Sequence, residues 1–149
     1  MKKRILSYSH AILALCLAAF FVYAGIKKFT PKNRPVTAKS LQEIGNAVSE
    51  NKYESPITFK LTTKSMRESG FLKVVGVLQI LAGLLIFLPK TRLIGLGILL
   101  PVTINIFLLH LLMDNRPDEN FETGLFLAVN LLLICFYWKR LKLLIVPKA

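Results

Sequence analysis

The chain has few cysteines, histidines and acidic residues. Its 149 residues include 2 cysteines, 2 histidines and 8 acidic residues, against 20 lysines and arginines, and its formal net charge is +12. Two cysteines are too few for a disulfide scaffold. The sequence contains no zinc-ligand cluster, no phosphate-binding glycine loop and no Ser/His/Asp constellation. We therefore expect no metal site and no catalytic residues.

Apolar residues are abundant instead. They make up 54% of the chain, more than the roughly 45–50% typical of soluble domains, and this excludes intrinsic disorder. Most of them fall in four blocks, at about 9–26, 71–88, 93–113 and 121–138. Each block is close to the roughly 20 residues that cross a bilayer as a helix. The sequence predicts an all-α, four-transmembrane-helix bundle, a single membrane domain over residues 1–149. The competing class, a soluble protein with buried helices, would need amphipathic helices.

The first apolar block allows a second interpretation. It follows the basic residues 2–4 and ends in Val22-Tyr23-Ala24, a pattern that also fits a signal peptide cleaved after Ala24. However, the block is long for a signal peptide and Lys27 and Lys28 follow it closely. These features favour a retained first span.

Basic residues predict the orientation. If the four spans alternate, the basic N-terminus, the connection at 89–92 and the basic C-terminal tail lie on one side, whereas the connection at 114–120 is mainly acidic. The positive-inside rule then places both termini in the cytoplasm. The long first connection, residues 27–70, is also basic and argues the other way.

The long connection carries three local signals. Ser40-Leu41-Gln42-Glu43 is a capping box, which predicts a short amphipathic helix on the membrane surface. Residues 57–62 alternate apolar and polar side chains, and we expect extended chain packed against the mouth of the bundle. A second capping box, Ser65-Met66-Arg67-Glu68, predicts that the second span begins before its apolar part.

Three amides lie inside the predicted spans at a similar depth: Gln79, Asn105 and Asn130. Polar side chains within spans are costly and are candidates for function. They either form a shared pocket or serve as interhelical hydrogen bonds. Gly76, Gln79 and Gly83 share one helical face, so we expect Gln79 to face a neighbouring helix.

His110 lies near the predicted outer end of the third span. It could accept a proton, ligate a metal or haem, or form a pH-sensitive pair with Glu122 or Asp114; an interfacial polar tip is the simpler alternative. A haem held by two histidines is not expected, because His10 lies at the opposite end of the bundle. Cys16 and Cys135 are expected to pack as small apolar residues.

Three lysines lie at the ends of predicted spans: Lys27, Lys28 and Lys73. Lysine stems can lie in the apolar layer while the ammonium groups reach lipid headgroups. Membrane lipid is therefore the expected partner, and no nucleic acid is needed to explain the positive charge.

Several segments together resemble the DoxX-like family of small bacterial four-helix membrane proteins. They are Gly25-Ile26-Lys27-Lys28-Phe29, Glu68-Ser69-Gly70-Phe71-Leu72, the second span from Val77 to Leu84, the turn Pro89-Lys90-Thr91-Arg92, and the third span from Leu100 to His110. The resemblance implies a location in the bacterial plasma membrane and, for some members, association with quinone-linked or thiol-redox complexes. Many relatives carry glutamate where this chain has Gln79, which removes the ionisable group from that position.

From these observations we expect a non-catalytic membrane component that acts beside a redox or transport partner. The alternative is a binder or enzyme that acts on a lipid-like molecule or a quinone in an outer-half pocket formed by Gln79, Asn105, Asn130 and His110. The sequence specifies no cofactor; the resemblance leaves a quinone open.

Overall fold

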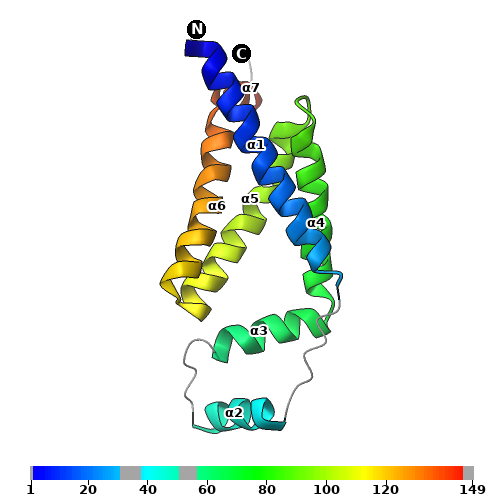
Figure 1. Cartoon of the computed structure of the whole chain (residues 1–149), viewed down its shortest axis with the longest axis vertical. Helices are drawn as coiled ribbons and strands as arrows, with labels where there is room; N and C mark the ends of the chain where they lie inside the picture. Colours follow the sequence, from blue (N-terminus) through cyan, green and yellow to red (C-terminus); the bar gives the residue numbers. More distant parts are fainter. Residues whose placement is uncertain (1, 31–37, 51–56, 146–149) are drawn as a thin grey trace.

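The computed structural model describes residues 2–30, 38–50 and 57–145, and the secondary structure of these residues is entirely helical. The bundle consists of α1 (Lys2–Lys27), α4 (Phe71–Phe87), α5 (Arg92–Leu109) and α6 (Pro117–Cys135). A π-helical segment, η1 (His110–Asp114), continues α5. Figure 1 shows that α1 begins at the same end of the bundle as α7 (Trp138–Ile145), and that α2 (Ala38–Ser49) and α3 (Ile57–Glu68) lie beyond the other end. The all-α prediction is confirmed.

Two segments are long and apolar enough to cross a membrane, Tyr8–Lys27 and Arg92–Asp114, and the bent pair α3 and α4 makes a third candidate. Helix α4 alone has 17 residues, or about 25 Å at 1.5 Å per residue. Helix α6 begins with acidic residues in its first turn, Asp118 and Glu119. Composition therefore supports a membrane protein with two or three spans.

Helices α1 and α4 pack closely through small residues. A Cβ atom added to Gly83 would lie 2.5 Å from Cγ2 of Val22 and 2.9 Å from the carbonyl oxygen of Ala18. A Cβ atom on Gly76 would lie 2.9 Å from the carbonyl oxygen of Gly25. Only glycine allows such an approach of the two backbones. The predicted face of Gly76, Gln79 and Gly83 is confirmed, because all three residues are buried.

The long connection differs from the sequence prediction. The amphipathic helix is present as α2, but it begins at Ala38, so Ser40 lies inside the first turn and not at the N-cap. The prediction of extended chain at 57–62 is wrong, since these residues begin helix α3. A single strand would leave its backbone groups without partners, whereas a helix pairs them internally.

The second span does not extend back through the second capping box, so that prediction is wrong as well. The chain bends by 82° between α3 and α4, and Gly70 at the bend has φ +78°. Glycine adopts this left-handed conformation without a steric cost. As a result α3 lies across the mouth of the bundle, where it contacts α4 and η1 (Figure 1).

The predicted fourth span, 121–138, is displaced in the structure. Helix α6 begins earlier, at Pro117, because proline at the first helical position and acidic residues in the first turn favour a helix start. It ends at Cys135, and the amide of Tyr137 donates to the carbonyl of Ile134 in a tight turn before α7. The basic helix α7 is therefore separate from the span.

Candidate functional site

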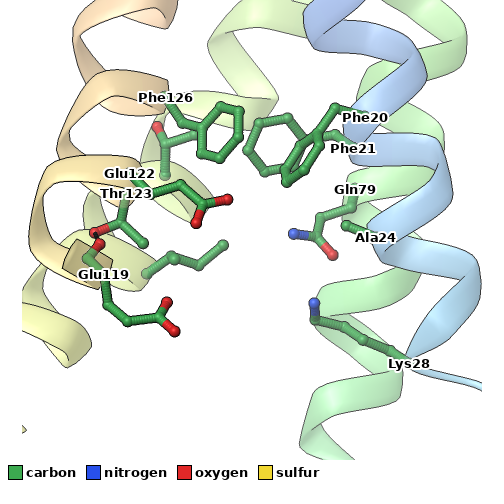
Figure 2. A pocket seen from close by; sticks show the side chains of 11 residues that line it. Phe20, Phe21, Ala24, Lys28, Gln79, Glu119, Glu122, Thr123 and Phe126 are labelled. Carbon is green, nitrogen blue, oxygen red and sulfur yellow. Dashed lines mark hydrogen bonds between the residues drawn. The ribbon is translucent and has the colours of Figure 1, made fainter. Parts of the chain in front are cut away.

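A cavity of about 170 Å³ lies between α1, α4, α5 and α6. We call it the bundle cavity (Figure 2). Its lining residues are Phe20, Phe21, Ala24, Lys28, Gln79, Thr103, Ile106, Glu119, Glu122, Thr123 and Phe126. The rings of Phe20 and Phe126 stack at 4.1 Å between centroids, where α1 meets α6. The cavity is thus aromatic toward the end that carries the termini and polar toward the end that carries α3.

Gln79 lines this cavity with a buried amide. Its side chain is 1% exposed, and no described group hydrogen-bonds its Oε1 atom. Figure 2 shows the amide pointing into the cavity from α4. A buried polar atom without a partner costs free energy. The position therefore suits a ligand that donates a hydrogen bond.

The rim of the cavity carries opposite charges on its two sides. Lys28 extends from the end of α1, whereas Glu119 and Glu122 extend from α6 (Figure 2). The backbone near Lys28 is held against α4, because a Cβ atom on Gly76 would lie 3.1 Å from Cβ of Lys28. Glycine packing between α1 and α4 thus fixes where this ammonium group enters the cavity.

Of the four residues predicted to share a pocket, Gln79, Asn105, Asn130 and His110, only Gln79 lines the bundle cavity. Gln79 and Asn130 are buried, whereas Asn105 is exposed. Thr103 takes its place: it lines the cavity and accepts a hydrogen bond of 3.3 Å from Nδ2 of Asn130. Thr103 and Asn105 lie about 160° apart on a helix, so only one can face the bundle.

Hydropathy did not distinguish Thr103 from Asn105, because α5 is apolar on all sides. The buried residues Leu96, Leu99 and Thr103 are spaced by three and four positions, which is the spacing of one helical face. Glu119 was missed for another reason: the predicted span began at Phe121, so Glu119 appeared to belong to a loop. Glu122 was predicted only as a possible partner of His110. The structure extends the helix to Pro117 and directs both glutamates to the cavity.

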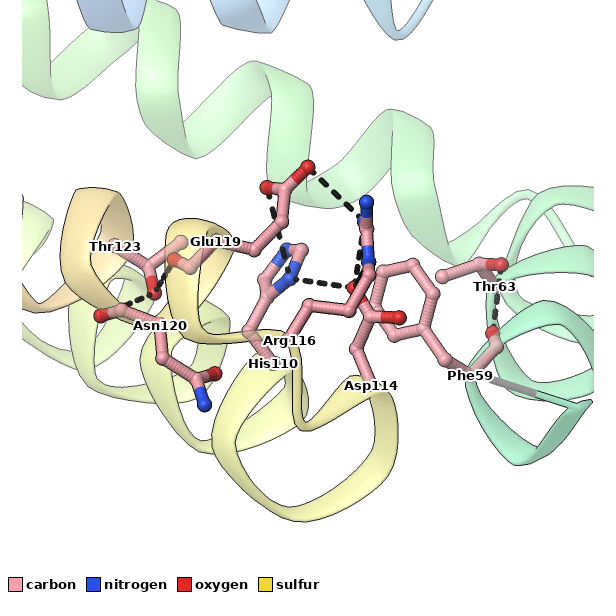
Figure 3. Close-up of polar contacts among 8 residues, drawn as sticks. All are labelled: Phe59, Thr63, His110, Asp114, Arg116, Glu119, Asn120 and Thr123. Carbon is pink, nitrogen blue, oxygen red and sulfur yellow. Dashed lines mark hydrogen bonds and ion pairs between the residues drawn. The ribbon is translucent and has the colours of Figure 1, made fainter. Parts of the chain in front are cut away.

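His110 does not line the cavity but belongs to a polar cluster beside it (Figure 3). Its Nδ1 atom lies 3.3 Å from Oδ2 of Asp114 and 3.9 Å from Oε2 of Glu119. Arg116 donates to the same oxygen of Asp114 at 2.7 Å and to Oε1 of Glu119 at 3.0 Å. The ring of Phe59 on α3 covers the histidine, with 4.7 Å between ring centroids. Glu119 thus belongs to both the cluster and the cavity.

The hydrogen bond from Arg116 to Asp114 raises the pKa of the guanidinium above its ordinary value. Arg116 is therefore charged throughout the physiological range, and it holds the Asp114 carboxylate, whose side chain is 1% exposed. Of the two partners predicted for His110, Asp114 lies close to it, while Glu122 lines the bundle cavity.

The remaining candidates lie apart from the cavity. Lys27 and Lys73 are exposed, and Nζ of Lys27 lies 4.5 Å from the ring centroid of Tyr23. Cys16 and Cys135 are exposed free thiols, so their predicted packing inside the bundle is wrong. Because apolar side chains face lipid as readily as they face a neighbouring helix, the sequence could not distinguish these positions.

The other histidine, His10, contacts Phe136 near the end of α6, with 4.8 Å between ring centroids. In the described part of the chain, no group of three or more His, Cys, Asp or Glu residues is arranged to hold a metal ion.

Comparison of the chain with protein-family models, curated proteins and solved structures finds no match. The resemblance to the DoxX-like family therefore stays a prediction, and the functional argument rests on the geometry of the bundle cavity.

Proposed function

We propose that this protein crosses the membrane four times and binds a lipid-like molecule in the bundle cavity. The observation that carries the proposal is the buried Gln79 amide, which lines a cavity with one aromatic end and one charged end. Its Oε1 atom has no hydrogen-bond partner among the described residues. Polar groups at membrane depth are expensive and mark functional sites. A bound amphipathic molecule would satisfy this one.

The arrangement of the helices supports four crossings. Helices α4 and α6 lie beside the two long apolar segments, Tyr8–Lys27 and Arg92–Asp114, and enclose the cavity with them. Helix α1 begins at the same end as α7, as an even number of crossings requires (Figure 1). With the positive-inside rule, that end lies in the cytoplasm of a bacterial cell, and the charged rim faces the outer leaflet of the plasma membrane.

The size of the cavity limits what enters it. Its volume of about 170 Å³ is close to that of an apolar cavity, of about 150 Å³, that holds one benzene molecule in another protein. A headgroup or a single ring fits, whereas a whole lipid does not. The apolar chains of the ligand would therefore lie outside the cavity, against the lipid-facing surfaces of the helices.

The polar groups of the cavity suit binding more than chemistry. They are an amide, two threonine hydroxyls and charged groups at the rim. We infer that the protein is non-catalytic by itself. A role beside a redox or transport partner, which the DoxX-like resemblance implies, is compatible with ligand binding.

Native mass spectrometry of the protein in lipid discs tests the proposal. The wild type should carry a lipid-like adduct that Gln79→Leu loses. Asn105→Leu is the matched control, since it makes the same change at an exposed position of α5. Circular dichroism should show equal helix content in all three proteins. An adduct that survives Gln79→Leu as well as it survives Asn105→Leu would overturn the proposal, as would a wild type without any adduct.

A further inference from the structure

The charged rim of the bundle cavity has a polarity that a ligand would have to match. Its cation, Lys28, comes from the end of α1, and its anions, Glu119 and Glu122, come from α6 on the other side (Figure 2). One carboxylate is already engaged, because Arg116 donates to Oε1 of Glu119 at 3.0 Å. Glu122 forms no ion pair within the described parts of the chain and extends over the cavity.

A ligand with one net charge would fit this rim poorly. An anionic headgroup would be attracted to Lys28 but repelled by Glu122. A purely cationic headgroup would be attracted to Glu122 but repelled by Lys28. Near the low-dielectric interior of a membrane these interactions are stronger than in water. A headgroup that carries a negative and a positive charge a few atoms apart would place an opposite charge beside Lys28 and beside Glu122.

We infer that the ligand is a lipid with a zwitterionic aminophosphate head, whose phosphate lies toward Lys28 and whose ammonium lies toward Glu122. The inference rests on the proposed function. Lysine ammonium groups bind phosphate oxygens as point charges, and carboxylates accept hydrogen bonds from an ammonium. A primary ammonium fits better than a quaternary one, since the Glu122 carboxylate accepts hydrogen bonds from N–H donors, which a quaternary ammonium lacks.

The aromatic end of the cavity distinguishes a lipid from a free headgroup. Phe20, Phe21 and Phe126 lie toward the other end of the cavity from the charges. These apolar rings favour contact with hydrocarbon, so they favour a ligand whose headgroup is joined to apolar chains. A soluble aminophosphate would leave these rings without a contact.

Headgroup competition in lipid discs tests the inference. The discs contain equal amounts of phosphatidylethanolamine, phosphatidylcholine and phosphatidylglycerol with the same acyl chains, and native mass spectrometry counts each adduct. The wild type should favour phosphatidylethanolamine over each of the others by about fivefold to tenfold, as one charge-assisted hydrogen bond allows. Glu122→Gln should lose most of that preference, and Glu122→Lys should shift it to phosphatidylglycerol. Glu68→Gln, an exposed glutamate of α3 outside the cavity lining, should behave as the wild type.

The outcomes separate the two proposals. A lipid adduct that depends on Gln79 but shows no headgroup preference, or a preference that Glu122→Gln and Glu122→Lys leave unchanged, would overturn the zwitterionic head while the binding function stands. Displacement of the adduct by soluble phosphoethanolamine would also overturn it, because a free headgroup would then suffice. Loss of every adduct from the wild type would instead overturn the proposed function itself.

Discussion

Nδ2 of Asn130 donates a hydrogen bond to Oγ1 of Thr103 at 3.3 Å, and this contact joins α6 to α5 between two buried side chains. Thr103 in turn donates to the carbonyl of Leu100 in its own helix at 2.9 Å. The two interpretations of the amides therefore apply to different residues. Asn130 forms an interhelical hydrogen bond through Nδ2, whereas Gln79 lines the cavity. The amide oxygens of both residues are buried without a partner among the described residues.

This contact should contribute modestly to stability. We expect a double-mutant cycle of Thr103→Val and Asn130→Leu to give a coupling energy of about 0.6 kcal/mol, the average for such bonds in membrane bundles. The measurement is the free energy of unfolding in mixed micelles. Asn105→Leu replaces Thr103→Val in the control cycle and should be additive with Asn130→Leu, because Asn105 is exposed. Equal coupling energies in the two cycles would contradict the hydrogen bond between Asn130 and Thr103.

Close packing of α1 on α4 should make Gly83 intolerant of substitution. A Cβ atom there would lie 2.5 Å from Cγ2 of Val22, so we expect Gly83→Ala to lower the free energy of unfolding by about 1–3 kcal/mol through overpacking.

Gly97→Ala is the matched control, since no heavy atom lies within 4 Å of a Cβ atom at that position. It should leave stability unchanged or raise it by up to about 1 kcal/mol, because alanine favours helix more than glycine does. If both variants unfold alike, the close approach of α1 and α4 is not present in the membrane.

Arg116 should stabilise the turn between η1 and α6. Without it, the buried carboxylate of Asp114 keeps only the contact of 3.3 Å with His110. We expect Arg116→Gln to cost about 1.5–3 kcal/mol, as is usual for the loss of hydrogen bonds to a charged group. The measurement is again unfolding in mixed micelles.

The double variant Asp114→Asn with Arg116→Gln should be more stable than Arg116→Gln alone, because it removes the unpaired charge. Asp118→Asn, at an exposed position in the first turn of α6, should cost less than Arg116→Gln, about 0.3–1 kcal/mol, because it removes only a charge near the helix N-terminus. A double variant that is less stable than the single one would show that the carboxylate does not depend on Arg116.

Four crossings predict a definite labelling pattern. In a protein whose cysteines are replaced by alanine, we would introduce one cysteine at Lys90, at Lys142 or at Ser49, all exposed positions. A membrane-impermeant maleimide should label Ser49→Cys on intact spheroplasts, whereas Lys90→Cys and Lys142→Cys should react only after lysis. Labelling of Ser49→Cys and Lys142→Cys from the same side would exclude the three spans proposed between them, α4, α5 and α6.

Hydropathy alone predicted most of the helices. The first three apolar blocks agree with α1, α4 and α5 with η1 to within a few residues, except that α1 begins seven residues earlier than predicted, at Lys2. Helix α3 was missed because strict alternation over six residues is the pattern of a strand. Residues two positions apart lie about 160° apart on a helix, so the alternation does not indicate one. Only the surroundings, which offer no partner strand in the described residues, show that the helix is the stable choice.

The order of the amino acids is sufficient to predict an apolar helical protein with candidate membrane spans, the close α1–α4 face of Gly76, Gln79 and Gly83, and the buried place of Gln79. These follow from composition and from small residues at helical spacing. The rotation of α5 is different. Its surface is apolar all round, so periodicity did not show whether Thr103 or Asn105 faces inward, and packing against α4 and α6 decides it. The bundle cavity likewise exists only once α1 and α6 bring the charge of Lys28 opposite Glu122, because a relation between side chains on separate helices is a property of their packing.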